Sequence, residues 1–339
     1  MNNSLFRLIP FTLLVLTSLA TLGYSQTTLP FETRFVGVER FEELMAEARE
    51  KNWETLPFGK RVSTIGYSLL GIPYENYTLE IDDHIEAPSA NFDGMDCWTF
   101  FEISVAAARM LDLPESSHDP ETFLKLIELD RYHGGVCTGS YLSRLHYLED
   151  WAADNHARGL MVNLTQELRG RKAPLRCREM TLGWKYYRYM RNNPDLREDI
   201  QKMEQRVERE RHYYIHEKDV PKIEDQIQDG DVIGIFSHNS RRISTSHVGL
   251  AYRDQEGTLR FMHATTQSRH GRKTALDSRL TTYLARFPKH AGILVCRPRP
   301  LPENLKSSLS PQADTDDISF ASEPSSLRLK PFLKEQPSL

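Results

Sequence analysis

One cysteine of the sequence lies in a setting that suits a nucleophile. Cys97 falls in the stretch NFDGMDCWTF, directly after Asp96 and directly before a segment with helical periodicity. Asp96 is well suited to cap a helix beginning at Cys97, because its carboxylate can accept the N–H of the second or third helical residue. A cysteine in the first turn experiences the positive end of the helix dipole, which favours thiolate over thiol. The alternative, a small buried hydrophobic residue, describes most free cysteines and stays open at this point.

A thiol nucleophile needs a base, and two histidines are candidates, His247 in STSHVGLAY and His263 in LRFMHATT. We expect residues 246–252 and 258–263 to form a hairpin with a five-residue loop at 253–257. In that register the two histidines face each other with Cβ atoms about 5 Å apart, so one imidazole can act as base while the other orients it. A four-residue loop would put them on opposite faces, so the inference depends on loop length.

The same cysteine and histidines could instead bind zinc. Zinc sites usually include a close pair such as CxxC or HxxxH, and here the nearest pair is 16 residues apart, across the hairpin. We therefore expect no metal and no cofactor. Four cysteines, at 97, 137, 177 and 296, are too few and too scattered for a disulfide framework, although one disulfide is possible in an oxidising compartment.

The ends of the chain indicate where the protein acts, and its charge balance indicates which class of partner is disfavoured. Arg7 is followed by an apolar run at 8–22, broken by Pro10, which we interpret as a secretory signal peptide at 1–25. The run is shorter than the roughly 20 residues of a membrane span, so an uncleaved anchor is the weaker alternative. We expect an exported protein, periplasmic or extracellular, that is free of the membrane after signal removal. With 43 Lys and Arg against 47 Asp and Glu, the balance disfavours a nucleic-acid partner.

The helices and strands that position these residues are predicted from the spacing of apolar residues along the chain. Helices are expected at 41–51, 60–70, 97–111, 121–129, 142–155 and 182–212, the last interrupted by NNP. An extended segment is expected at 74–81. The runs DGDVIGIF, SHVGLAY, LRFMHAT and AGILVCR read as strands of an antiparallel sheet. The fold class is therefore α+β, with helices first and a sheet last. The Pro-, Ser- and Asp-rich residues 299–339 cannot bury enough apolar surface and are expected to form a disordered tail.

A set of short motifs occurs in an order that is specific when taken together: GIPY, MDCWTFFE, RYHGG, YLSRLHYLEDW, YYI, DGDVIGI, SHVGL and MHAT. In these motifs the chain resembles the N-acetylmuramoyl-L-alanine amidase-like family of bacterial exported proteins, a branch of the NlpC-type papain-like cell-wall hydrolases, over residues 35–298. Two features depart from the family pattern. His216 follows YYI where proline is expected, and Cys137 and Cys177 have no evident family role.

The resemblance implies a papain-like fold in which the nucleophile opens a helix that packs on an antiparallel sheet carrying the histidines. Matched residue by residue, Cys97 is the nucleophile, His247 the general base and His263 the orienting residue. Tyr74 matches a tyrosine that helps to hold the oxyanion, although a packed turn aromatic would also account for it. Backbone N–H groups at the start of the Cys97 helix are placed to share that task.

The motif YLSRLHYLEDW matches the family's central segment, which contains Arg144, His146, Asp150 and Trp151. The spacing predicts that His146 and Asp150 share one face of a helix, so these residues would form either a wall of the substrate groove or an internal polar network.

The implied reaction is acyl transfer from an amide in peptidoglycan or a muropeptide, and the family name points to the bond between N-acetylmuramic acid and L-alanine. Cleavage between D-glutamate and the diamino acid is the nearest alternative. A wall-binding module on an inactivated fold and an acyltransferase are two others. The sequence does not indicate an oligomeric state.

Overall fold

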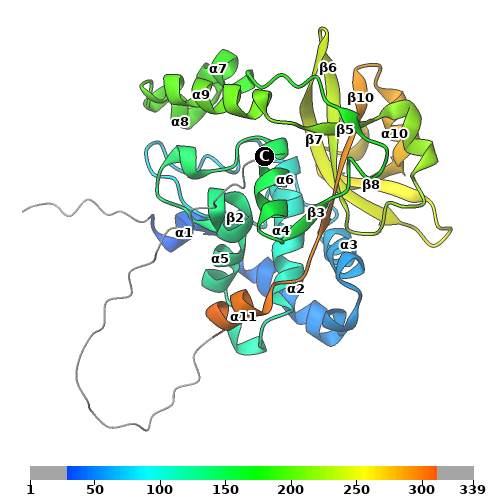
Figure 1. The fold of residues 1–339 in the computed structure, drawn as a ribbon. Helices are drawn as coiled ribbons and strands as arrows, with labels where there is room; N and C mark the ends of the chain where they lie inside the picture. Colours follow the sequence, from blue (N-terminus) through cyan, green and yellow to red (C-terminus); the bar gives the residue numbers. More distant parts are fainter. Residues whose placement is uncertain (1–28, 311–339) are drawn as a thin grey trace, which may run out of the picture.

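The computed structural model describes residues 29–310. The expected signal peptide at 1–25 and residues 311–339 of the expected tail lie outside this range. In Figure 1 most of the helices lie to one side of a twisted sheet built from the second half of the chain, which confirms the α+β class. Within residues 29–310, no helix is both long enough and apolar enough to cross a membrane.

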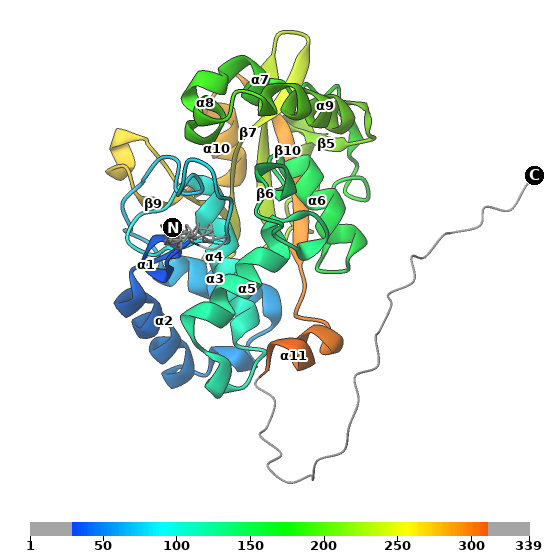
Figure 2. The ribbon, with the colours of Figure 1, turned by 90° about the vertical axis from the view of Figure 1, so that its left-hand side faces the viewer.

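The helices follow the expected order, with differences at their ends. They are α1 (Phe31–Arg34), α2 (Val38–Glu50), α3 (Phe58–Ser68), α4 (Cys97–Met110), α5 (Pro120–Arg131), α6 (Leu148–Ala157), α7 (Glu179–Gly183), α8 (Arg188–Asn192), α9 (Leu196–Arg209), α10 (Leu280–Arg286) and α11 (Glu303–Leu309). Helices α7, α8 and α9 occupy the expected 182–212 region and gather at the top of the molecule in Figure 2.

The strands are β1 (Phe35–Val36), β2 (Ala90–Asn91), β3 (Met161–Asn163), β4 (Arg171–Lys172), β5 (Tyr213–His216), β6 (Val232–Asn239), β7 (Arg242–Arg253), β8 (Leu259–Ala264), β9 (Thr274–Arg279) and β10 (His290–Pro298). Strands β1 and β2 form a small parallel pair. The others form an antiparallel sheet in the order β4-β5-β10-β6-β7-β8-β9, with β3 also paired to β10. The four expected strands correspond to β6, β7, β8 and β10, which lie at the centre of this sheet.

Alternating side chains of the central strands bury both faces of the sheet. On β6, Val232 and Phe236 join the larger core beneath the helices, whereas Ile233 and Ile235 join a second core on the opposite face with α10. Helix α4 runs through the larger core and contacts α3, α5, β7 and β8. Nearly all of its residues are buried, as expected for a helix that is apolar on every side.

Two buried ion pairs fix α4 against α5. Arg109 Nη1 lies 2.5 Å from Asp130 Oδ1, and Arg131 Nη2 lies 2.8 Å from Glu102 Oε2. Because removing one partner of such a pair leaves an uncompensated buried charge, each pair strongly opposes displacement of the helix. The position of α4, and hence of its first residue, is therefore well defined.

Three expectations about the elements were wrong. The expected helix at 142–155 begins only at Leu148, because a short 3-10 turn at Tyr141–Ser143 is followed by extended backbone. The expected extended segment at 74–81 consists mostly of turns, with Tyr74 forming an isolated bridge to Met95. Residues 299–310 of the expected tail are ordered, since α11 packs there and Leu301 is buried in a core with only 3% of its surface exposed.

Candidate active site

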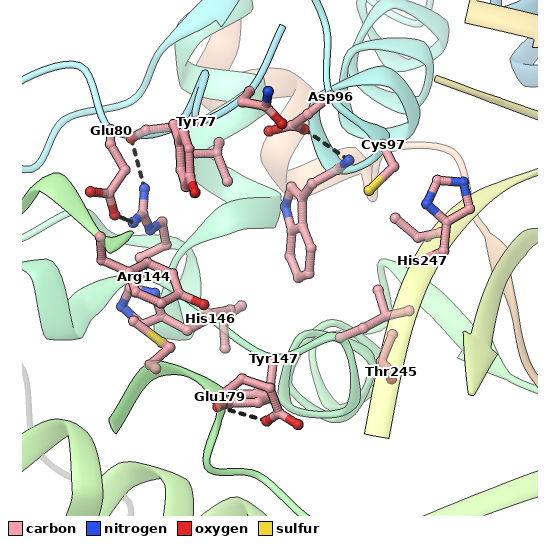
Figure 3. Close-up of a pocket in the computed structure, with 18 of the residues that line it drawn as sticks. Tyr77, Glu80, Asp96, Cys97, Arg144, His146, Tyr147, Glu179, Thr245 and His247 are labelled. Atoms are coloured by element: carbon pink, nitrogen blue, oxygen red, sulfur yellow. Dashed lines mark hydrogen bonds and ion pairs between the residues drawn. The ribbon is translucent and has the colours of Figure 1, made fainter. Parts of the chain in front are cut away.

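A cavity of about 430 Å³ opens at the amino-terminal end of α4. Cys97 and Trp98 of α4 and Thr245 to Val248 of β7 line one end of it, and Glu80, Arg144 and His146 line the other (Figure 3). Glu179 and Met180 of α7 and Tyr187 close a further side. The cavity therefore combines the expected nucleophile and base with side chains from three separate parts of the chain.

The capping of α4 at Asp96 is confirmed. Asp96 Oδ1 accepts the N–H groups of Trp98 at 2.9 Å and Thr99 at 2.8 Å, and Thr99 Oγ1 in turn accepts the Asp96 N–H at 3.1 Å. This reciprocal capping box satisfies the exposed donors of the first turn and fixes where the helix starts. Cys97 is consequently the first helical residue, and its side chain is partly exposed in the cavity.

The expectation that the helix start would favour a thiolate is not met in the resting site. Burial and, to a smaller extent, the neighbouring Asp96 carboxylate raise the pKa of the Cys97 thiol to about 12. Backbone N–H groups of Val248, Cys97 and Trp98 act in the opposite direction but do not outweigh burial. The thiol is thus protonated at neutral pH, and the Val248 N–H places its sulfur beside the strand that carries His247.

The two histidines lie together on one face of the hairpin. His247 Nε2 is 2.5 Å from His263 Nδ1, and the rings are nearly perpendicular with centroids 4.8 Å apart. The expected register was wrong by two residues, because Tyr252 pairs with Arg260 and the five-residue loop falls at 254–258. A two-residue shift preserves the face, so the histidines meet as diagonal neighbours instead of directly opposed ones.

Both imidazoles are neutral at ordinary pH. Burial lowers the pKa of His247 well below 6.5, and the adjacent His263 lowers it further. Burial also lowers the pKa of His263, whose side chain is fully enclosed. A neutral imidazole beside a protonated thiol can accept the thiol proton, so the pair has the protonation states that a general base and its nucleophile require.

A carboxylate that the sequence did not reveal lies behind His263. Asp277 Oδ2 of β9 is 3.5 Å from His263 Nε2, and the Asp277 side chain is 2% exposed. In the β8–β9 hairpin His263 pairs with Ala275, which puts Asp277 on the histidine face. The register of this second hairpin was the signal that could have identified it.

The Asp277 carboxylate also contacts three other side chains. Arg269 Nη2 lies 2.5 Å and His270 Nε2 3.0 Å from Oδ2, and Arg286 Nη1 lies 3.0 Å from Oδ1. The ligand atoms of His263, His270 and Asp277 are all within 4.8 Å of one another, a separation that a metal ion could bridge. The two guanidinium groups already neutralise the carboxylate and would repel a dication, so the residues fit an ion-pair cluster better.

The other expected site residues divide into two groups. Tyr74 lines the cavity near Cys97, and burial raises the pKa of its phenol, which therefore remains a hydrogen-bond donor. Arg144 and His146 also line the cavity. Arg144 Nη2 pairs with Glu80 Oε1 at 3.3 Å, and His146 Nε2 lies 2.7 Å from the Tyr141 carbonyl oxygen. These two side chains are therefore held rigidly at the end of the cavity away from Cys97.

Asp150 and Trp151 do not line the cavity. Asp150 forms an ion pair with Arg206 of α9, and Trp151 is fully buried against Phe101 of α4 with ring centroids 4.9 Å apart. The expected helix face shared by His146 and Asp150 does not exist, because α6 begins at Leu148. For Asp150 the internal network was the correct alternative, since its carboxylate joins α6 to α9.

Comparison with known proteins identifies a family and several solved structures that the chain resembles. The model of the N-acetylmuramoyl-L-alanine amidase-like family matches residues 64–293. A crystal structure of an N-acetylmuramoyl-L-alanine amidase from Bacteroides uniformis is similar at 26% identity and a TM-score of 0.64, covering 71% of this chain and 99% of that one. The comparison with curated proteins gave no match.

Two further solved structures share the fold. A Bacteroides fragilis protein described as a candidate xylanase is 28% identical with a TM-score of 0.60, covering 68% of this chain and 98% of that one. A Legionella pneumophila protein is 21% identical with a TM-score of 0.58, covering 77% and 95%. At that identity the likeness to the Legionella protein concerns the fold alone.

Proposed function

Because the chain belongs to the N-acetylmuramoyl-L-alanine amidase-like family, we propose that it is an exported cysteine hydrolase that cleaves an amide bond of peptidoglycan. The observation that carries the proposal is the meeting of Cys97, at a capped helix start, with the His247–His263 pair in one cavity. The proposed fold relationship is to papain-like enzymes of the NlpC type, and the proposed compartment is the periplasm or the exterior of the cell.

The proposed reaction begins with a neutral pair. As the Cys97 sulfur attacks the amide carbonyl carbon, His247 takes the thiol proton, so charge separates only while the S–C bond forms. His247 then gives that proton to the leaving nitrogen as the C–N bond breaks, leaving a thioester on Cys97. A water molecule, deprotonated by His247, attacks the thioester, and the released thiolate recovers the proton.

The tetrahedral intermediate needs hydrogen-bond donors at its oxyanion. Asp96 accepts the Trp98 and Thr99 N–H groups of the first turn of α4 but not that of Cys97, and the Tyr74 phenol lines the same cavity. Preorganised donors of this kind are worth about 10²–10³-fold in kcat each. We assign the oxyanion site to these two groups.

The bond between N-acetylmuramic acid and L-alanine is the preferred target, because the family and the Bacteroides uniformis protein are both named for that amidase activity. The proposed substrate is therefore a muropeptide that retains its sugar. Arg144 and His146, at the far end of the cavity, are the residues assigned to contact it beyond the scissile bond.

One observation favours the endopeptidase alternative. Glu179 lines the cavity, where the Arg178 N–H and the Tyr147 hydroxyl donate to its Oε2, while among residues 29–310 no donor contacts its Oε1. That second oxygen could bind the amine of a stem peptide that has already lost its sugar. Asp96 is less suited to that task, because Thr78, Trp98 and Thr99 already donate to its oxygens.

The test is to incubate the protein with defined muropeptides and to identify the products by mass, beside Cys97→Ala. Release of a stem peptide that begins with L-alanine, lost in Cys97→Ala, would support the amidase. A cut after D-glutamate would replace it with the endopeptidase. Cleavage of an amide bond with its acyl group recovered on an added amine, and not as a free acid, would indicate acyl transfer, and binding without any product would indicate a wall-binding module.

A further inference from the structure

Beyond the nucleophile and the two histidines, the structure contains a buried carboxylate whose position suggests a role. We propose that Asp277 is a positioning residue that fixes the tautomers of His263 and His247, so that Nδ1 of His247 is the atom that accepts the Cys97 proton. The proposal rests on the proposed function, because it explains how the base of that reaction is prepared.

The first step concerns the ionisation state of the Asp277 carboxylate. Asp277 accepts the Ser278 N–H and lies beside His263 and the Arg269 guanidinium, and these neighbours hold its pKa far below the usual range although burial acts to raise it. An ionised carboxylate can only accept hydrogen bonds. His263 Nε2 lies 3.5 Å from Asp277 Oδ2, beyond good hydrogen-bond distance, so the attraction of the carboxylate charge favours the proton on Nε2 of the neutral ring.

The tautomer of His263 then determines that of His247. If the His263 proton is on Nε2, its Nδ1 is an acceptor, and the 2.5 Å contact requires His247 Nε2 to donate. The neutral His247 ring has only one proton, so its Nδ1 is left with a free lone pair. That nitrogen is the one available to the thiol, since Nε2 is occupied by His263.

The surroundings of the histidine pair make this arrangement rigid. His263 is fully buried between Phe261 at 4.7 Å and Tyr283 at 5.4 Å, measured between ring centroids, so its ring cannot turn without displacing an aromatic neighbour. The ionisable groups that face the pair from all packed elements are Cys97 of α4, His270, Asp277, Arg269, Tyr283 and His290. Asp277 is the anionic group of that set that stabilises an imidazolium at either histidine.

If Asp277 had only a structural role, its substitution and that of Arg286 would have similar effects. Asp277 joins the segment at 268–270 to α10 through Arg269 and Arg286, and such an ion-pair cluster could be needed only for stability. In that case Arg286→Gln, which removes the charged partner of Oδ1, should have the same consequences as Asp277→Asn. Under the positioning role, Arg286→Gln leaves the Asp277–His263 contact in place and should resemble the wild type.

The experiment measures alkylation of Cys97 by iodoacetamide as a function of pH, by peptide mass, in the full chain, Asp277→Asn and Arg286→Gln. This readout needs no peptidoglycan substrate, so it is independent of whether the proposed function is correct. We expect Asp277→Asn to slow alkylation at pH 7 about tenfold or more and to shift the profile to higher pH, because the carboxylate no longer stabilises the imidazolium. Arg286→Gln is expected to stay within about twofold of the wild type. Equal profiles for Asp277→Asn and the wild type, or equal losses in both variants, would overturn the proposal.

A second measurement does not depend on a variant that folds. Nitrogen-15 NMR of the histidine rings in the wild-type chain reports which nitrogen carries each proton. The proposal requires the Nε2–H tautomer at both His247 and His263, and an Nδ1–H tautomer at His247 would overturn it. Absence of muropeptide cleavage with these tautomers present would instead count against the proposed function alone.

Discussion

At the scale of single residues, the proposed nucleophile and base are uncharged before substrate binds. Burial raises the pKa of Cys97 and lowers that of His247, so both groups hold their neutral forms at physiological pH. Charge must then be created during attack, in a cavity where the Cys97 N–H and the Tyr74 phenol can stabilise it. This differs from a cysteine stored as a thiolate, and it makes the reaction depend on His247 as a base.

The pH dependence of the reaction follows from this resting state. A protonated His247 cannot accept the thiol proton, so activity should be lost as pH falls through the pKa of His247. Since that pKa lies well below 6.5, kcat/KM is expected to stay within about twofold from pH 8 to pH 6.5 and to decline only below that range. Initial rates on a muropeptide across pH 4–9 provide the measurement. An acidic limb centred above pH 6.5 would contradict the neutral-pair description.

The sequence identified the residues whose roles depend on local context. The placement of Asp96 and Cys97 could be predicted because a helix cap is encoded within four residues. Asp277 could not, because its significance arises only when β9 pairs with β8. Trp151 was assigned to a groove from its motif, but a large aromatic side chain in a short helix can face inward equally well, and here it packs on Phe101.

At the scale of elements, the cap of α4 has both a structural and a positional task. Asp96→Ala is expected to cost about 1 kcal/mol of the free energy of unfolding, because two N–H donors lose their acceptor. It should also lower kcat/KM by at least tenfold, since the first turn frays where Cys97 and its N–H must be held. Urea unfolding and muropeptide kinetics measure the two effects.

The matched control is Asp119→Ala. Asp119 caps α5 by accepting the Thr122 N–H at 2.9 Å and lies outside the cavity. The same stability loss is expected there with kcat/KM unchanged. Similar activity losses in both variants would mean that global destabilisation, not the position of Cys97, explains the effect of Asp96→Ala.

A buried acid, Glu149 of α6, contacts β7, the strand that carries His247. Thr245 donates to Glu149 Oε1, while no group of residues 29–310 forms a hydrogen bond with Glu149 Oε2, and burial raises the pKa of this carboxyl to about 7. A folded-state pKa above the unfolded value means that the folded state binds more protons, so stability should fall as pH rises from about 4.5 through 7. Glu149→Gln, which carries no charge, should remove this slope and be about 1–3 kcal/mol more stable at pH 8.

Urea unfolding of the wild type and Glu149→Gln at pH 5, 6, 7 and 8 measures this difference. The curves should converge at pH 5 and diverge above pH 6. A constant difference between the two proteins at every pH would show that Glu149 does not titrate in this range.

The hairpin shows which part of an element the sequence can specify. Strand parity was predictable, because alternating burial fixes which side chains share a face. The register was not, because a five-residue loop at 253–257 and one at 254–258 preserve the same face. The loop at 254–258 is stabilised by Asp254, whose side chain accepts the Thr258 N–H at 2.8 Å. Spacing alone does not reveal this contact.

At the scale of the whole molecule, the ordered domain extends beyond the last strand. Arg109 Nε of α4 donates to the Arg299 carbonyl oxygen at 3.1 Å, the Leu301 N–H donates to Asp112 Oδ2 at 3.1 Å, and Leu301 is buried. Residues 299–310 thus close the larger core near the carboxyl end of α4. The order of these residues was not predicted, because their composition is polar. One buried leucine and two backbone contacts leave little pattern in a sequence.

This contact predicts a stability effect far from the cavity. Leu301→Ala is expected to lower the free energy of unfolding by about 2–4 kcal/mol, because a buried side chain leaves a void in the core. Leu182→Ala, at a position 70% exposed on α7, should change it by less than about 0.5 kcal/mol. Urea unfolding compares the two. Equal values would mean that Leu301 contributes nothing to the core.

The overall class was predictable because the hydrophobic period changes from helical to alternating near residue 213. The flanking strands β5 and β9 were missed, since each is short and polar residues such as His216 and Asp277 interrupt its apolar pattern. Their pairing comes from neighbouring strands and not from local preference.

The central claim is that Cys97 forms a covalent acyl intermediate. Its most direct test is to mix the protein with a cleavable muropeptide, quench with acid within the first turnover, and locate any added mass by peptide mapping. We expect a thioester on Cys97, with none on Cys137, Cys177 or Cys296, and no product from Cys97→Ala. Cleavage by Cys97→Ala at the wild-type rate would contradict it.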